Sequence, residues 1–178
     1  MQGVCYSLKR LGGMWFSAYQ AYDSDKFICL DGLAPAACLV YSFGIRGEWQ
    51  FEDTVAALGC TVHAFDPSVT FPALRGQRTH FHRVGVAAAR DQAQGMDTLA
   101  NLLAANGHTE AQVFYLKVDI EGMELEALPE WVASGALEHV QQLAMELHLP
   151  PIHEQDRYPA SIFSGVCSFC SFLSFSCS

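Results

Sequence analysis

The clearest pattern in the chain is an alternation of short apolar runs with segments of helical length. The run at residues 39–43 (LVYSF) is followed by a glycine turn, a helix-length segment and a second run at residues 61–65 (TVHAF). Residues 113–118 (VFYLKV) are almost continuously apolar, as expected for a parallel strand that is buried on both faces. Strands that alternate with helices predict an α/β fold with a parallel sheet.

Further segments continue this alternation. Two more strands are predicted at residues 80–84 and 140–146. Apolar residues at helical spacing predict three helices, which end at Gly59, at Asn106–Gly107 and at Gly135. Pro129 lies within the last of these helices and is expected to break or kink it.

The N-terminal region carries a separate aromatic pattern. Trp15, Tyr19 and Tyr22 recur at a spacing that places them on one face of a short helix. We therefore predict a helical segment that covers the sheet, followed by a short strand or hairpin arm at residues 27–30.

The last 19 residues, from Ala160 to Ser178, contain seven serines, four phenylalanines and three cysteines but no charged residue. A transmembrane helix needs about 20 mostly apolar residues, and this segment is too rich in serine to be assigned as one. We predict three regions: a covering segment at residues 1–37, a ligand-binding core at residues 38–151, and a tail at residues 152–178 that is foreign to the core.

Charge narrows the classes of partner. The formal net charge is −9, and no Lys/Arg cluster offsets it, so a nucleic-acid partner is not expected. The N-terminus shows no recognisable secretory signal.

The seven cysteines do not suggest a disulfide framework in a chain of this length. Cys29, Cys38 and Cys60 lie in or beside apolar segments and are predicted to be buried free thiols. The pair Cys167 and Cys170 has the C-x-x-C spacing, but no preceding strand or second pair supports a zinc or redox site.

An acid follows the second apolar run. Asp66 comes about 20 residues after Gly44, which is the spacing of a carboxylate that holds ribose hydroxyls in a nucleotide-binding βαβ unit. Small residues at Gly44 and Gly47 let the backbone approach a ligand, and the acid accepts hydrogen bonds from the ribose diol. The turn reads G-I-R-G rather than G-x-G-x-x-G, so an ordinary βαβ unit without a ligand remains an alternative.

More acids follow the later strands. Asp119 and Glu121 come after the run at residues 113–118, and Glu146 and His148 close the next strand. The carboxyl ends of parallel strands meet at one edge, so these groups are expected to converge on a single crevice. We assign no metal site. A divalent metal held by Asp119, Glu146 and His148 is an alternative that activity in the presence of a strong chelator would exclude. His80 and His82 would share a face, but without an obvious third ligand we expect packed or solvent-facing histidines.

Three stretches carry a resemblance to a known family: CLVYSFGIRGEWQFED (38–53), GCTVHAFDPS (59–68) and YLKVDIEGMELEAL (115–128). They resemble class I S-adenosylmethionine-dependent methyltransferases of the FkbM-like branch, with a Rossmann-like sheet. The resemblance covers roughly residues 10–148 and makes residues 38–151 a cofactor-binding methyltransferase core. It implies that the cofactor is held by Phe43, Gly44, Gly47, Asp66, Pro67 and Asp119.

The chain departs from the family pattern in two places. Ser42 stands in the first strand, where many class I enzymes carry an acid, and the glycine turn is short. The family fold has seven strands, whereas the strand pattern of this sequence ends with the strand at residues 140–146. We therefore predict a sheet that lacks the last strands, as in a truncated product, with an exposed apolar edge.

The resemblance implies O-methylation of a hydroxyl acceptor, a small molecule or a glycan. The acceptor would be deprotonated by Asp119, Glu121 or His148, and the cofactor would supply the methyl electrophile. Two alternatives are kept: a truncated, non-catalytic module for cofactor binding or interaction, and an NAD-dependent oxidoreductase. The sequence names neither the acceptor, the oligomeric state nor the localisation, although the family relatives are expected in the secretory pathway.

Overall fold

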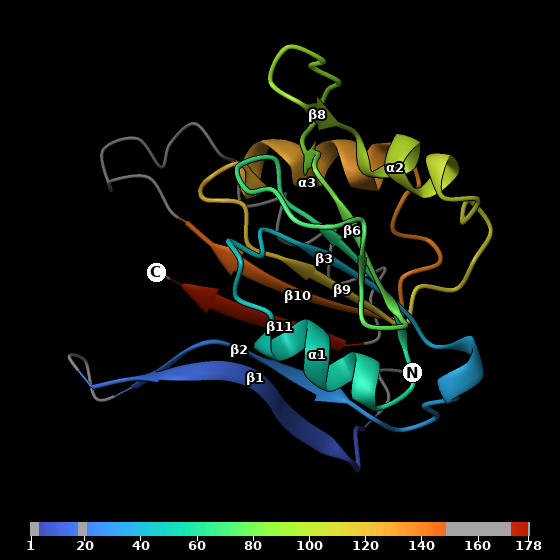
Figure 1. Ribbon diagram of the computed structural model, residues 1–178. Coiled ribbons are helices and arrows are strands. Elements are labelled where there is room, and N and C mark those ends of the chain that lie inside the picture. The colour runs from blue at the N-terminus through green and yellow to red at the C-terminus, as the bar shows by residue number, and fades with distance from the viewer. Residues whose placement is uncertain (1–3, 18–20, 149–171, 178) are drawn as a thin grey trace.

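The computed structural model describes residues 4–17, 21–148 and 172–177 (Figure 1). Its centre is a seven-stranded sheet with the order β11-β10-β9-β3-β4-β6-β5, in which every neighbouring pair is parallel except β5 and β6. The strands are β3 (Leu39–Phe43), β4 (Thr61–Phe65), β5 (Leu74–Arg75), β6 (Thr79–His82), β9 (Tyr115–Val118), β10 (Gln142–Leu147) and β11 (Phe172–Cys177). The predicted α/β fold with a mainly parallel sheet is confirmed.

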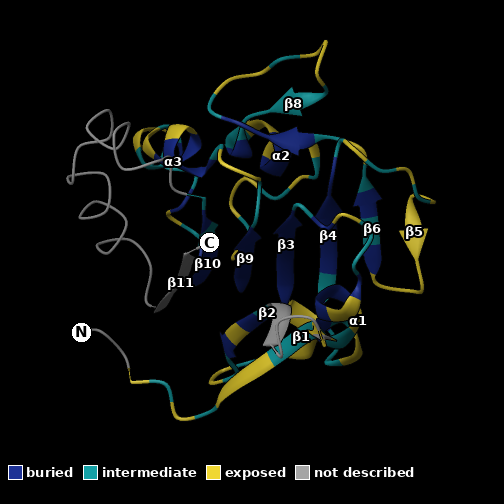
Figure 2. Ribbon diagram, turned by 90° about the vertical axis from the view of Figure 1, so that its left-hand side faces the viewer, coloured by how far each residue is buried: buried dark blue, intermediate teal, exposed yellow. Residues whose placement is uncertain are grey.

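Helices cover the sheet on both faces, as Figures 1 and 2 show. Helices α2 (Leu99–Ala105) and α3 (Glu124–Ala133) lie on one face, and α1 (Gln50–Ala57) lies on the other. A short 3-10 helix (Pro35–Ala37) precedes β3, and a two-stranded ladder pairs β7 (Gly85–Val86) with β8 (Met96–Asp97). The three predicted helices are all present, but α3 continues through Pro129, so the expected break does not occur.

The core follows the alternation of each strand. Tyr41 and Phe43 of β3 join the cluster that packs against α2 and α3, whereas Val40 joins the cluster that includes Phe51 and Val55 of α1. Because β3 is buried along its whole length, its sequence is continuously apolar apart from Ser42. Trp131 of α3 is fully buried in the first cluster.

The strands at the centre are in close register, and this register defines the functional edge. Phe43 at the end of β3 pairs with Phe65 of β4 on one side and with Val118 of β9 on the other. The residues that follow these three ends are Gly44, Asp66 and Asp119. The glycine and both acids therefore reach the same edge of the sheet.

The N-terminal region differs from the predicted helical cover. Strands β1 (Leu8–Phe16) and β2 (Ala21–Cys29) form an antiparallel hairpin beside α1, in which Trp15 pairs with Tyr22. Tyr19 lies outside the described residues, and Gly12 and Gly13 have positive φ values that a helix would not use. The strand predicted at residues 27–30 is confirmed as the end of β2, where the Gln142 side chain bonds both backbone groups of Cys29.

Disulfides replace the predicted buried thiols. Cys5 is bonded to Cys29, and Cys38 is bonded to Cys60. The second pair follows from the βαβ topology, because Cys38 and Cys60 directly precede Leu39 and Thr61, which pair at the start of β3 and β4. The prediction of free thiols at Cys29, Cys38 and Cys60 is wrong.

The outer edge of β10 is also different from the prediction. Strand β11 lies beside β10 and pairs with it in parallel, from Gln142 with Phe172 to Leu147 with Cys177. The expected exposed edge on β10 is therefore covered. The C-x-x-C pair at residues 167 and 170 lies outside the described residues. Within the described ranges, no helix is long and apolar enough to span a membrane.

Candidate functional site

Gly44 begins the turn that follows β3. Its φ is +73°, and a Cβ added there would overlap the carbonyl oxygen of Asp119. The backbone N–H of Gly44 donates to the Phe65 carbonyl oxygen at 2.9 Å, and the N–H of Asp119 donates to the Phe43 carbonyl oxygen at 3.2 Å. Only glycine allows the turn after β3 and the end of β9 to approach this closely.

Asp66 organises the loops around the end of β4. It is 3% exposed, and its Oδ2 accepts from the backbone N–H of Arg46 at 2.8 Å. Its Oδ1 accepts from the backbone N–H and the hydroxyl of Ser68, at 2.8 and 2.6 Å. A carboxylate offers about four acceptor positions, so three are used and about one remains for a ligand hydroxyl.

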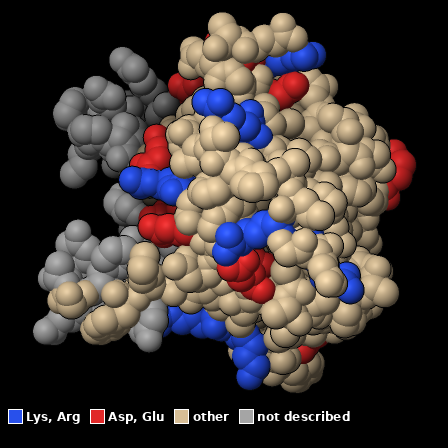
Figure 3. Space-filling view, viewed as in Figure 1, with Lys and Arg blue, Asp and Glu red and all other residues tan. Residues whose placement is uncertain are grey.

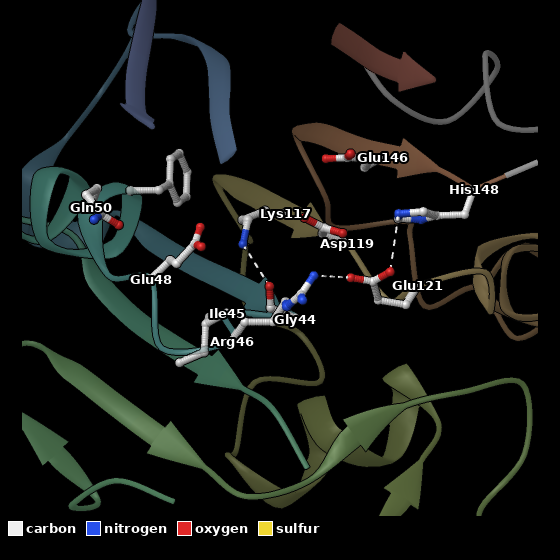
Figure 4. A pocket seen from close by; sticks show the side chains of 11 residues that line it. Gly44, Ile45, Arg46, Glu48, Gln50, Lys117, Asp119, Glu121, Glu146 and His148 are labelled. Carbon is white, nitrogen blue, oxygen red and sulfur yellow. Dashed lines mark hydrogen bonds and ion pairs between the residues drawn. The ribbon is translucent and has the colours of Figure 1, made fainter. Parts of the chain in front are cut away.

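Two left-handed residues meet above the glycine turn. Arg46 has φ 47° and Glu121 has φ 57°, a region that residues other than glycine rarely occupy. Their side chains form an ion pair at 2.6 Å between Nη1 and Oε1 (Figure 4). The backbone conformation thus points an exposed cation and an exposed anion toward each other across the edge of the sheet.

Asp119, Glu146 and His148 converge, as predicted from the strand ends. One ligand atom from each residue lies within 4.8 Å of the other two. The pKa of Asp119 is raised, first because burial disfavours the charged carboxylate and then because Glu146 adds like charge. Burial lowers the pKa of His148, but the hydrogen bond to Glu124 and the nearby acids outweigh it, so the net shift is upward.

Glu124 was not anticipated as part of the site. It is fully buried, and its carboxylate accepts from the backbone N–H groups of Ile120 and Gly122 at 2.9 and 3.0 Å. Its Oε1 also contacts His148 Nδ1 at 3.0 Å. Glu124 therefore fixes both the loop after β9 and the imidazole that follows β10. The only sequence signal was its place in the first turn of α3. Acids are common there because they interact favourably with the positive end of the helix dipole.

Two buried lysines complete the site and were also missed. Lys117 donates to the Gly44 carbonyl oxygen at 3.2 Å and lies 3.8 Å from Glu52, which in turn accepts from the Ser42 hydroxyl at 2.5 Å. Lys26 reaches from the hairpin to Glu146, with Nζ and Oε2 3.1 Å apart. Ser42, which departs from the family pattern, is thus hydrogen-bonded to Glu52 of α1.

Two adjoining cavities open at this edge. The larger, of about 410 Å³, is lined by Phe43, Gly44, Arg46, Phe65, Asp66, Pro67, Ser68, Gly85, Val86, Met96, Asp119, Ile120, Glu121 and Met123. The smaller, of about 290 Å³ and drawn in Figure 4, is lined by Gly44, Ile45, Arg46, Glu48, Gln50, Phe51, Lys117, Asp119, Glu121, Glu146 and His148. Both contain Gly44, Arg46, Asp119 and Glu121, so these four residues stand between the cavities.

The predicted site residues divide between these cavities. Phe43, Gly44, Asp66, Pro67 and Asp119 line the larger one, and Glu121 and His148 join Asp119 in the smaller one. Gly47 lines neither, and a Cβ there would lie 3.1 Å from the Phe71 ring.

Figure 3 shows acidic and basic side chains side by side on the left of the molecule, where the arrowhead of β10 lies in Figure 1.

His80 and His82 are part of a separate cluster of stacked imidazoles. His63 stacks with both imidazoles, and its Nδ1 lies 3.0 Å from His82 Nε2. His108 packs edge-on against His63, and its Nδ1 lies 2.8 Å from the Tyr41 hydroxyl. The expectation of packed histidines fits this arrangement.

Comparisons with known proteins agree on one family. A family model described as a methyltransferase domain matches residues 3–177. The chain is 34% identical over 139 residues to the probable methyltransferase-like protein 24 of Rattus norvegicus, covering 68% of this chain and 38% of that protein. It is 31% identical over 135 residues to the Homo sapiens protein of the same name, covering 70% of this chain and 36% of the relative. The alignments thus span little more than a third of these curated relatives, and no solved structure matches.

Proposed function

Because this chain belongs to a family of methyltransferase domains, we propose that it binds S-adenosylmethionine and transfers the methyl group to a hydroxyl oxygen. The acceptor is proposed to be a small molecule or a glycan. The observation that carries the proposal is the larger cavity, which runs from Asp66 past Gly44 to Asp119 along the carboxyl ends of adjacent parallel strands.

The residues of the larger cavity suit a nucleoside with a charged tail. Asp66 retains about one acceptor position, which supports one hydrogen bond from a ribose hydroxyl rather than the two expected from the sequence. Val86 and Met96 provide an apolar wall for an adenine ring, and Gly44 lines the same cavity together with Asp66 and Asp119.

The smaller cavity supports the acceptor half of the reaction. The bound cofactor supplies an electrophilic methyl group on a sulfonium centre. The chain would orient an acceptor hydroxyl at Asp119, which both cavities share, and would receive its proton as the oxygen–methyl bond forms and the sulfur–methyl bond breaks. Asp119 is the first candidate for the base, because its raised pKa makes it a stronger proton acceptor than an ordinary carboxylate. His148, whose pKa is also raised, is the second candidate.

The two disulfides support a proposal on localisation. Disulfides persist in oxidising compartments and are rare where thiols are kept reduced. Cys38 and Cys60 are 4% and 1% exposed, so their bond belongs to the folded core. We therefore propose that the folded chain resides in an oxidising compartment such as the secretory pathway.

Titration calorimetry of the purified chain with S-adenosylhomocysteine and, separately, with NADH tests the proposed cofactor. We expect saturable binding of one S-adenosylhomocysteine per chain and no binding of NADH. Saturation with a ligand at a hundredfold excess over its dissociation constant should also stabilise the fold by about 2.7 kcal/mol. A folded chain that binds NADH alone would instead support an oxidoreductase, and one that binds neither ligand would overturn the proposal.

A further inference from the structure

The smaller cavity contains a set of metal-ligand atoms that methyl transfer itself does not require. Asp119 follows β9, while Glu146 and His148 end the adjacent strand β10, and their ligand atoms lie within 4.8 Å of one another. Cis ligands of an octahedral ion with bonds of about 2.1 Å are roughly 3 Å apart, and trans ligands are roughly 4 Å apart. The upper limit of 4.8 Å is slightly wider than these separations, so small side-chain movements would bring the three atoms to one ion.

The orientation of His148 is an independent observation that points to the same ligand. Its Nδ1 lies 3.0 Å from Oε1 of the buried Glu124, and a carboxylate can only accept a hydrogen bond. Nδ1 must therefore carry the proton, which leaves Nε2 with the lone pair when the ring is neutral. A histidine that donates its other N–H to a carboxylate is the usual arrangement behind a metal-bound imidazole. Figure 4 shows the His148 ring pointing toward Asp119, Glu121 and Glu146.

The charges of the cavity favour a cation as well. Four carboxylates line it, from Glu48, Asp119, Glu121 and Glu146, against the two cations Arg46 and Lys117. Within the described residues, the Asp119 carboxylate accepts no hydrogen bond. Lys26 Nζ lies 3.1 Å from Oε2 of Glu146, and a bound ion would have to share this carboxylate with that ammonium group.

We propose that Asp119, Glu146 and His148 bind a divalent transition-metal cation of the Mn²⁺ type at the edge of the smaller cavity. Two carboxylates and one imidazole suit Mn²⁺, whereas Mg²⁺ prefers oxygen ligands alone. Three protein ligands leave positions open for water or for an acceptor oxygen. An ion there would lower the pKa of a bound hydroxyl and would take over the activation assigned above to Asp119 or His148, which as ligands would no longer act as bases. Only this last role depends on the proposed methyl transfer; binding of the ion does not.

The test uses the purified, oxidised full chain titrated with Mn²⁺ and followed by electron paramagnetic resonance. We expect one saturable Mn²⁺ per chain, with binding weakened at least tenfold by Glu146→Gln and by His148→Ala. Glu48→Gln is the matched control, because Glu48 lines the same cavity outside the ligand set, so the loss of its charge should weaken binding much less than the loss of a ligand. Circular dichroism must show that each variant is folded.

A further variant distinguishes specific binding of the ion from general attraction to negative charge. Glu124→Gln retains the size of the side chain but removes the carboxylate that fixes His148, and we expect about tenfold weaker Mn²⁺ binding. Absence of saturable binding, or equal weakening by Glu48→Gln and Glu146→Gln, would overturn the proposal. S-adenosylhomocysteine binding measured in parallel without metal distinguishes this outcome from failure of the proposed cofactor.

Discussion

At the scale of single residues, the site depends on a backbone position that only glycine can occupy. Gly44→Ala should destabilise the fold by several kcal/mol, because the new Cβ would overlap the Asp119 carbonyl oxygen in addition to the cost of a positive φ. Gly32→Ala is the matched control: Gly32 has the same φ of +73°, and nothing lies within 4 Å of its added Cβ. Urea unfolding of both variants checks this, and equal losses of stability would contradict the close approach at Gly44.

The strongest single-residue effect on cofactor binding is expected at Asp66. Asp66→Ala removes the acceptor for a ribose hydroxyl and also releases the backbone of Arg46 and Ser68. S-adenosylhomocysteine affinity should fall more than about tenfold, which corresponds to roughly 1.4 kcal/mol. Asp53→Ala is the control, because Asp53 is an acid paired with Arg75 that lines neither site cavity. An unchanged dissociation constant for Asp66→Ala in calorimetry would remove Asp66 from the cofactor site.

Glu121 offers a way to separate stability from function. Its φ of 57° is costly for a residue with a side chain, and its ion pair with Arg46 is exposed. Glu121→Gly should therefore change the free energy of unfolding by less than about 1 kcal/mol, since relief of strain offsets the greater entropy of the unfolded chain. The same variant should lower methyl transfer at least tenfold once an acceptor is known, because Glu121 lines both cavities and its Oε2 lies 3.7 Å from Nε2 of His148, the second candidate base. A variant that loses several kcal/mol would show that Glu121 has a structural role instead.

At the scale of elements, the disulfide between Cys38 and Cys60 fixes the βαβ unit that carries the glycine turn. It closes a loop across a sequence separation of 22 residues, for which loop-closure entropy gives about 3 kcal/mol. The Cys38→Ala/Cys60→Ala double variant should lose at least that much in urea unfolding. Cys5→Ala/Cys29→Ala removes a bond of similar separation, 24 residues, at the half-buried end of the hairpin, and should lose less because less packing is disturbed.

How far an element could be predicted depends on whether its signal is local. Strands β3, β4 and β9 were found because a parallel strand buried on both faces is apolar throughout, and Asp66 and Asp119 were found because they close those strands. The hairpin was missed because Trp15 and Tyr22 fit a helical spacing as well as a pairing across two strands. Lys26 and Lys117 were missed because their partners are distant in sequence. Glu124 was missed because an acid in the first turn of a helix is common and does not by itself indicate a site.

The disulfide between Cys38 and Cys60 could have been predicted from the order of the strands in the sheet. Two cysteines that directly precede adjacent parallel strands start at the same edge of the sheet, as Cys38 and Cys60 do. Cysteine spacing alone cannot reveal this, because the helix between the strands determines which residues meet. Strand β11 had no such signal, since its serine-rich sequence lacks the apolar continuity of the inner strands.

At the scale of the whole molecule, the face of the sheet that carries His63 links stability to pH. Burial, followed by the nearby His82, His108 and His80, lowers the pKa of His63 to about 3. The pKa values of His82 and His108 are lowered as well, first by burial and then by the charge of His80. His63 is therefore neutral in the folded chain at pH 5, whereas it is largely protonated in the unfolded chain, where its pKa is about 6.5.

The sign of the effect follows from proton counting. Between the folded and unfolded pKa values the unfolded chain binds more protons, so the free energy of unfolding rises with pH across this window and falls on acidification. For His63 alone, moving from pH 7 to pH 5 should cost about 2 kcal/mol. His148 acts in the opposite direction, because its raised pKa contributes stability that is present at low pH and is lost as pH rises through the folded value.

A variant isolates the contribution of His63 from that of the other groups. His63→Phe retains an aromatic ring for stacking against Tyr41 and gives up the contact with His82. Urea unfolding of both chains at pH 7 and pH 5 should show that the original chain loses about 2 kcal/mol more than the variant, because the variant has no imidazole to protonate on unfolding. Equal losses would mean that His63 is protonated in the fold. The acid sensitivity shared by both chains would then have to arise at other histidines whose pKa is lowered in the fold, such as His82 and His108, because the raised pKa values of Asp119 and His148 act in the opposite direction.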